Sequence, residues 1–276
     1  MRRVFNWEPS DKLFEHPDWT SEEVQEYTAE WGTSHKPGCR PRISQAGEWC
    51  PMASERIKII PENEWSDILA DPNRVDLRTA VFDILDQDGV GSCATEATAG
   101  AIMATGSFAG RPTEILNPWA MYRVVSGGID RGSNIDTCLA YARENGIPPE
   151  RLHPRNLGWR AKPSDEAVAA ALENRIVEFY DIQNKTEFGS ALLQGFAVVY
   201  GRRGHALCGL WLASLREFVF GNSWDESWGN NGMGQESLSG INWGYGAFAV
   251  RTLTDREAPV RQRVSEIPPL PPGLRG

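Results

Sequence analysis

Helical and strand patterns occupy different parts of this chain. Patterns with helical spacing predict helices at about 92–105, 117–125, 134–145, 164–173 and 186–194. Short runs rich in Val, Phe, Leu and Trp lie mostly further along and predict strands at about 176–181, 195–200, 205–213, 216–221 and 246–252. Because helices and strands that are separated along a chain pack as separate layers, this order predicts an α+β fold with a helical lobe and a sheet lobe.

The two ends of the chain differ in composition from its middle. The N-terminal part is rich in Trp, Pro and polar residues, and a capping box at 20–23 predicts a helix that continues to about Trp31. A second short helix is expected to begin at Pro61. The C-terminal end is Pro-rich and predicts an extended tail. The chain is therefore divided into an N-terminal extension, a main domain and a tail: 1–74, 75–255 and 256–276.

Charge and hydropathy exclude several classes of function. The 276 residues carry a net charge of −9 without a basic block, so we expect no nucleic-acid partner, which would require a cationic surface. No apolar run approaches the ~20 residues needed to span a bilayer, so no membrane partner is expected. The arginines at the N-terminus are not followed by the apolar run of a secretory signal. We expect a cytoplasmic or virion-associated protein.

The chain contains five cysteines, an odd number without close pairing in sequence. This count argues against a disulfide framework and favours reduced thiols in a reducing compartment. His35, Cys39 and Cys50 could suggest zinc, but no Cys-x-x-Cys pair and no fourth ligand accompany them. We therefore predict no metal site and no cofactor.

Cys93 lies where a Gly-rich loop meets a predicted helix. Gly89 and Gly91 allow a tight turn, and Ser92 is a suitable N-cap. A thiol at a helix N-terminus lies at the positive end of the helix dipole, which favours the nucleophilic thiolate. The alternative is that Cys93 is a small buried apolar residue, as most cysteines are.

His205 and Asn222 lie on two successive predicted strands joined by a tight turn near Ala213 and Ser214. Counting outward from that turn along a regular hairpin places position 205 opposite position 222, so the imidazole and the amide would be cross-strand neighbours. A base and the group that orients it need this arrangement. Taken singly, His205 could be a core histidine and Asn222 a residue at the end of a strand.

The same segments resemble the papain family of cysteine peptidases, over about residues 75–252 and in the family's order. Gln87 resembles the glutamine of the family's oxyanion hole, and 204–206 resembles its histidine motif. The run 221–232 closely resembles its Asn-Ser-Trp motif with the following Gly-rich turn, and 75–78 resembles the start of a mature domain. The resemblance implies a two-lobed fold in which an antiparallel sheet or barrel forms the second lobe.

The resemblance also implies chemical roles. Cys93 would attack the scissile carbonyl carbon, and His205 would protonate the leaving amine and later activate water. Asn222 would orient the imidazole. The Gln87 side chain and the Cys93 backbone N–H would stabilise the oxyanion.

Further residues would bind or shield the substrate. Trp224 would exclude water from the bond between Asn222 and His205. Gly132 and Ser133 would hydrogen-bond the substrate backbone, and Ala206 would lie near the pocket for the second residue before the cut.

Several positions depart from the family pattern. Val90 replaces a cysteine, Ala94 an aromatic residue and Ser133 a glycine, and the segment before His205 is short. These departures leave the candidate triad intact but alter the substrate sites, and a bacterial or phage relative fits better than a lysosomal one. Arg202 and Arg203 could line the cleft and favour acidic substrates, or they could belong to a solvated loop.

The leading hypothesis is a cysteine peptidase, and two alternatives accompany it. The chain could be a peptidase acting on polypeptide, a hydrolase of peptidoglycan cross-bridges or other isopeptides, or a papain-like fold used structurally in a phage particle or another assembly. The N-terminal extension could be propeptide-like, structural or a docking element, and we favour a permanent structural or docking role. Assembly partners would bind through this extension or the C-terminal tail.

Overall fold

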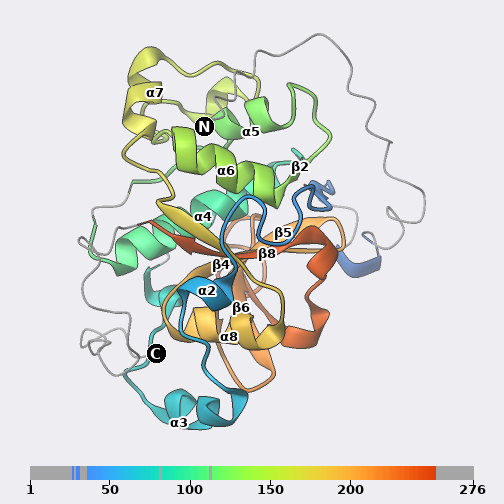
Figure 1. The fold of residues 1–276 in the computed structure, drawn as a ribbon. Helices are drawn as coiled ribbons and strands as arrows, with labels where there is room; N and C mark the ends of the chain where they lie inside the picture. Colours follow the sequence, from blue (N-terminus) through green and yellow to red (C-terminus); the bar gives the residue numbers. More distant parts are fainter. Residues whose placement is uncertain (1–26, 28, 32–35, 81–82, 112–113, 253–276) are drawn as a thin grey trace.

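The computed structural model describes residues 27, 29–31, 36–80, 83–111 and 114–252 (Figure 1). Its α-helices are α2 (Ala53–Arg56), α3 (Trp65–Ala70), α4 (Cys93–Phe108), α5 (Trp119–Val125), α6 (Ile135–Asn145), α7 (Asp165–Ala171) and α8 (Lys185–Leu193). Short 3₁₀ turns are η1 (Glu62–Glu64), η2 (Leu77–Ala80), η3 (Arg155–Leu157), η4 (Leu238–Gly240) and η5 (Trp243–Tyr245). The strands are β1 (Cys39–Arg40), β2 (Ser133–Asn134), β3 (Glu178–Asp181), β4 (Ala197–Arg202), β5 (His205–Leu212), β6 (Glu217–Gly221), β7 (Met233–Ser237) and β8 (Ala247–Arg251).

The main sheet has the strand order β3-β8-β4-β5-β6-β7, and every neighbouring pair is antiparallel. Helices α5, α6 and α7 lie together in the upper part of Figure 1, away from the sheet strands below. The predicted α+β fold with a helical lobe and a sheet lobe is confirmed. The large helices and five of the strands lie within a few residues of their predicted positions.

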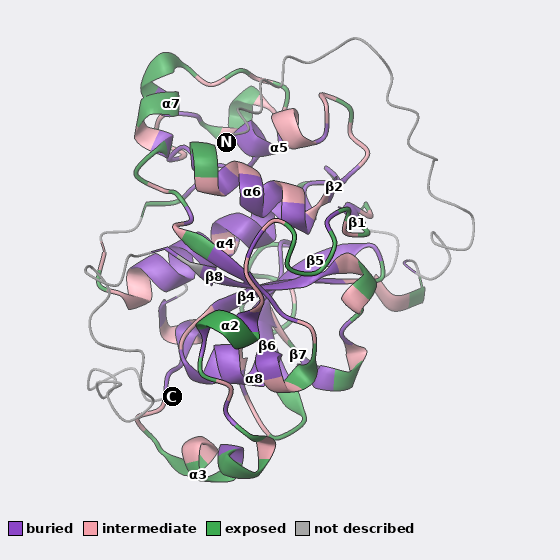
Figure 2. Cartoon of the chain, in the orientation of Figure 1, coloured by how far each residue is buried: buried purple, intermediate pink, exposed green. Residues whose placement is uncertain are grey.

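Helices cover both faces of the sheet. Phe188 and Leu192 of α8 pack in one apolar core with Tyr200 and Phe218 of the strands. Helix α4 belongs to a second core that includes strand residues of β4, β5 and β8. In Figure 2, α4, α8 and the strands between them are mostly buried. The sheet is thus enclosed, and α4 forms the contact between the lobes.

Helix α4 approaches the sheet closely because its inner face is built from small side chains. Ala97, Ala101 and Ala104 are all buried. Cys208 of β5 lies opposite, and an added Cβ at Gly100 would be 4.0 Å from the Cys208 Cβ. Small side chains let a helix backbone and a sheet come together without voids. Because Cys93 is the first residue of α4, this packing fixes its position relative to the strands.

Residues that precede Val75 are part of the packed structure. Trp65 has no exposed surface, and its indole N–H donates to the carbonyl of Ile60 at 3.0 Å. A Cβ added at Gly189 of α8 would lie 2.4 Å from the Trp65 ring, so α8 and α3 are in direct contact. The predicted helix at Pro61 is present as η1 and α3. Within the described ranges, no helix is both long enough and apolar enough to cross a bilayer.

The sequence patterns missed the short helix α2, the strands β1, β2 and β7, and the 3₁₀ turns η2 to η5. Strand β7 contains exposed Gln235 and Ser237 and a glycine, so it lacks the apolar alternation that marks a strand. The predicted capping box at 20–23 and the Pro-rich tail lie outside the described residues.

Candidate active site

Cys93 is the first residue of α4 and is completely buried. Ser92 occupies the N-cap position as predicted, but its hydroxyl does not cap the helix. It donates instead to Glu96 at 3.0 Å and accepts from the Trp119 indole at 3.2 Å. The turn before the helix depends on Gly89, whose φ of +71° lies in the left-handed region. The loop and helix therefore present the sulfur at the N-terminus of α4, as the sequence predicted.

His205 and Asn222 are in direct contact, with 2.7 Å between Nε2 of the ring and Oδ1 of the amide. The predicted register is nevertheless wrong. Cys208 pairs with Gly221, and the pairing shifts between Gly209 and Trp211. Continuing that register places residue 207, and not 205, opposite 222. Leu212 pairs with Phe218, so the turn is centred on residue 215 and not near Ala213 and Ser214. This turn displaces the register by three residues, and the irregularity between Gly209 and Trp211 restores one of them. The imidazole therefore reaches the amide diagonally.

Trp224 shields the contact between His205 and Asn222. Its ring stacks on the imidazole with 4.7 Å between centroids and an interplanar angle of 24°. Trp31, from the N-terminal part of the chain, packs edge-on against the imidazole at 5.2 Å and against Trp224 at 5.5 Å. His205 has no exposed surface, and Asn222 is 7% exposed. The hydrogen bond thus lies in an aromatic environment that excludes water.

The Cys93 sulfur lies beside the beginning of β5. Burial is the main influence on it and raises the pKa of the thiol to about 12, while hydrogen bonds from the backbones of Ala206, Ala94 and Gly38 act in the opposite direction and lower that pKa. Since Ala206 follows His205, the thiol and the imidazole are presented from adjacent segments of α4 and β5. In this arrangement Cys93 is a neutral thiol at physiological pH.

The Gln87 side chain is completely buried and fixed by four hydrogen bonds. Its carbonyl Oε1 accepts from the Ser223 hydroxyl at 2.8 Å and from the Trp224 indole at 3.1 Å. These two donors fix the orientation of the amide, so its Nε2 donates to the carbonyls of Val90 at 2.8 Å and Lys36 at 3.2 Å. The predicted residues Gln87, Trp224, His205 and Asn222 therefore form one continuous set of contacts. Ser223 is an additional member that the sequence patterns did not single out.

No protein-family model matches the chain, and no curated protein sequence matches it. Solved structures do match. Xylellain, a cysteine protease from Xylella fastidiosa, aligns with a TM-score of 0.60 and 21% identity over 80% of this chain and 98% of its own. The chain has a papain-like fold.

Two precursor structures agree with this assignment. A stem bromelain precursor aligns with a TM-score of 0.56 and 16% identity, covering 84% of this chain and 88% of its own. Digestive procathepsin L 3 of Tenebrio molitor larval midgut aligns with a TM-score of 0.53 and 16% identity, covering 83% and 89%. The likeness in fold thus extends over most of the chain.

In this papain-like fold the site is covered by residues 36–40, which we call the cleft segment. The carbonyl of Gly38 accepts from the Ser133 backbone at 2.8 Å, and β1 pairs with β2 in parallel. On the opposite side, the backbone N–H groups of Gly38 and Cys39 donate to the carbonyl of Gly204 at 3.0 and 2.9 Å. The cleft segment therefore lies between Ser133 and Gly204 and is hydrogen-bonded to both.

The cleft segment fits because glycine lies at each close approach. A Cβ on Gly38 would be 2.4 Å from the carbonyl oxygen of Gly91. A Cβ on Gly132 would be 2.3 Å from the carbonyl oxygen of Gly38, and Gly132 also has a φ of +84°. Gly132, Ser133 and Ala206 are thus placed around the sulfur and the cleft segment, in the part of the site where the sequence predicted substrate-binding residues.

An ion pair between η3 and helix α4 was not foreseen from the sequence. Arg155 pairs with Glu96 at 2.7 Å, and the Glu96 side chain is 1% exposed. Burial raises the pKa of Glu96, which Arg155 and the Ser92 hydroxyl counteract. Arg155 also donates to the carbonyl of Asp86, the residue before Gln87. It therefore connects α4 to the loop that carries the candidate oxyanion donor.

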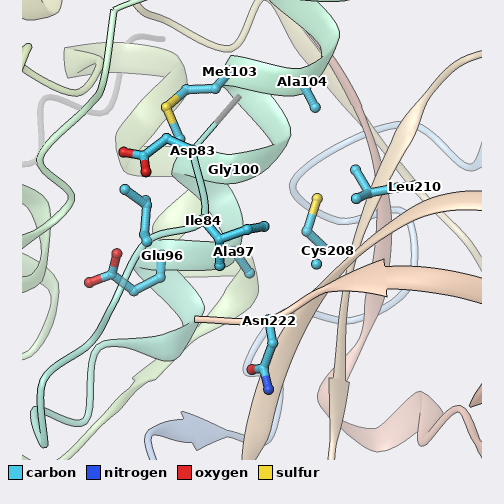
Figure 3. Close-up of a pocket in the computed structure, with 12 residues that line it drawn as sticks. Asp83, Ile84, Glu96, Ala97, Gly100, Met103, Ala104, Cys208, Leu210 and Asn222 are labelled. Carbon is cyan, nitrogen blue, oxygen red and sulfur yellow. The ribbon is translucent and has the colours of Figure 1, made fainter. Parts of the chain in front are cut away.

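A small cavity of about 30 Å³ lies between α4 and strands β5 and β6 (Figure 3). Ala97, Met103, Cys208 and Leu210 contribute to its mostly apolar wall, and Asn222 lies at its edge. This volume suits one or two water molecules and is too small for a peptide.

All five cysteines are free and buried. Among the residues that the structure describes, no three His, Cys, Asp or Glu side chains gather as a metal site requires. Cys39 and Cys50, considered above as zinc ligands, are both core residues, and His35 lies outside the described ranges.

Proposed function

We propose that the protein is a cysteine peptidase that hydrolyses peptide bonds of polypeptide substrates, with Cys93 as nucleophile, His205 as acid and base, and Asn222 orienting the imidazole. The observation that carries this proposal is the hydrogen bond from Gln87 Nε2 to the backbone carbonyl of Lys36. A peptide carbonyl of the cleft segment thus already accepts from the group expected to stabilise an oxyanion.

The proposed reaction begins with proton transfer from the Cys93 thiol to His205. The sulfur then forms a bond to the scissile carbonyl carbon, and Gln87 and the Cys93 backbone N–H stabilise the oxyanion. Collapse breaks the C–N bond, and the imidazolium gives its proton to the leaving amine, which leaves a thioester. Water, deprotonated by His205, attacks the thioester carbon and releases the carboxylic acid and the thiol. Asn222 holds the ring throughout by accepting at Oδ1 from Nε2.

The resting form is proposed to be closed by the cleft segment. The segment uses the backbone groups of Ser133 and Gly204 that a substrate would need, and Cys93 has no exposed surface. Residues that follow the segment, such as Ile60 and Trp65, are buried in the sheet lobe. This burial supports the interpretation that residues 41–74 remain with the domain after the cleft opens, and that the cleft segment itself moves.

The experiment is cleavage of a peptide library by full-length protein, with sequencing of the products. Gly38→Ala should cleave faster than wild type, because the added methyl group cannot approach Gly91 and the cleft segment must leave. Gly100→Ala is the matched control, since α4 has room for a methyl there. Cys93→Ala and His205→Ala, each in the Gly38→Ala background, should abolish cleavage. Folded Gly38→Ala protein that cleaves no peptide would contradict the proposal and favour a structural role for the fold.

A further inference from the structure

Arg202 is the last residue of β4, and Arg203 follows it in the turn that leads through Gly204 to His205. Arg202 pairs with His205 across this turn, and Arg203 and Gly204 both have positive φ values, of +44° and +77°. A two-residue turn of this kind keeps the strand ends close together. The two guanidinium groups are therefore fixed near the candidate general base.

The two guanidinium groups share one carboxylate. Arg202 contacts Oε1 of Glu30 at 2.6 Å, and Arg203 contacts Oε2 at 2.8 Å. Glu30 precedes Trp31, whose ring packs against the imidazole of His205. The part of the chain that covers the candidate catalytic site thus supplies an acidic side chain, which Arg202 and Arg203 bind beside that site.

The carboxylate site is organised independently of Glu30. Arg202 also contacts Glu236 at 2.7 Å, and the Glu236 side chain is 2% exposed. Glu236 in turn accepts from the Tyr200 hydroxyl at 2.9 Å. If Glu30 moved away, Arg202 would keep this buried partner and its position. Arg203, with a side chain 51% exposed, would turn toward a new ligand from solvent.

We propose that Arg202 and Arg203 form a recognition site for an acidic side chain of the polypeptide substrate, and that Glu30 occupies it in the closed form. This inference rests on the proposed function, because it assigns a substrate preference to the same cleft. Two guanidinium groups that converge on one carboxylate bind it more strongly and with more defined geometry than a single surface cation does. Substrate with Asp or Glu at the matching position would therefore displace the covering chain and enter the cleft.

The test measures binding, so it does not depend on catalysis. Full-length protein carrying Gly38→Ala, Cys93→Ser and Glu30→Gln opens the cleft, removes the carboxylate that pairs with the two arginines and inactivates the nucleophile. It is titrated with fluorescein-labelled decapeptides of Ala and Ser in which a single Glu is moved through the sequence, and with the matching Gln peptides. At one or more positions the Glu peptide should bind about fivefold to tenfold more tightly than its Gln counterpart.

Controls identify the residues responsible. Adding Arg203→Ala should remove the preference for the Glu peptide. Arg216 is an exposed arginine at the turn between β5 and β6, so adding Arg216→Ala should leave that preference unchanged. Thermal melting verifies that each variant is folded. A second measurement uses Gly38→Ala with Glu30→Gln and Cys93 intact, whose cleavage products should be enriched in Asp or Glu at one fixed position. Equal binding of Glu and Gln peptides at every position, including no binding of either, would overturn the inference. Failure of the proposed function would give a different result, because cleavage would be absent while the binding preference was retained.

Discussion

Gln87 has its carbonyl oxygen between two donors and its amide nitrogen toward the cleft. Because Ser223 and Trp224 both donate to Oε1, rotation of the amide would place two donors face to face. The motif that supplies Asn222 thus also orients the candidate oxyanion donor through the next two residues. Residues 222–224 therefore position both the imidazole of His205 and the side-chain amide of Gln87.

Removing this donor should slow the chemical step. We expect Gln87→Ala to lower kcat by about 100-fold with little change in KM, since an oxyanion donor acts mainly in the transition state. Ser223→Ala should cost less, about tenfold, because Trp224 still donates to Oε1. Gln235→Ala, an exposed residue of β7, is the control. The measurement is steady-state kinetics in the Gly38→Ala background, and an unchanged kcat in Gln87→Ala would contradict the assignment.

Among the secondary-structure elements, α4 connects the site to the rest of the fold. Its first turn carries Cys93 and Glu96, and Arg155 of η3 bridges Glu96 to the loop that contains Gln87. A carboxylate buried to this degree is stable only because a cation accompanies it. The ion pair thereby connects α4 to the loop that carries Gln87.

Loss of Arg155 should destabilise the protein strongly. We expect Arg155→Ala to lower the free energy of unfolding by about 3 kcal/mol, because it leaves the Glu96 carboxylate buried without its partner. The pKa of Glu96 is already raised by burial, and removal of the cation would raise it further. The deficit should therefore shrink as the pH falls from 8 to 5 and Glu96 becomes neutral. Urea unfolding at both pH values tests this, with exposed Arg160→Ala as control; equal stability of Arg155→Ala and wild type would refute it.

The sequence predicted the parts of the site that lie in continuous motifs. Cys93, His205 and Asn222 were found from a loop-to-helix junction and from two neighbouring strands, which are local features. The register of β5 against β6 could not be found, because the turn between them is centred on residue 215 and an irregularity follows between Gly209 and Trp211. Neither feature changes the order of apolar residues in the strands. The partnership of Arg155 with Glu96 joins positions 59 residues apart, and that of Lys36 with Gln87 joins positions 51 apart. Such contacts depend on tertiary packing, which periodicity does not encode.

At the scale of the whole molecule, the two lobes and the N-terminal part of the chain together enclose the thiol. The cleft segment bonds to Ser133 on one side and to Gly204 on the other, so it joins the helical lobe to the sheet lobe. Burial by these parts raises the pKa of Cys93 to about 12. The closed form should therefore contain little thiolate at neutral pH, and exposure of the thiol should lower its pKa toward the range of reactive cysteines.

The most direct test is the rate at which a peptide epoxide alkylates Cys93, followed by intact mass and peptide mapping from pH 6 to 10. We predict slow labelling of wild type that rises about tenfold per pH unit, because the thiolate fraction rises in this way below the pKa. Gly38→Ala should be labelled at least tenfold faster at pH 7 and with a flatter pH profile. Equal labelling rates in both proteins, or modification at other cysteines while Cys93 stays unreacted in folded Gly38→Ala, would contradict a nucleophilic Cys93 closed by the cleft segment.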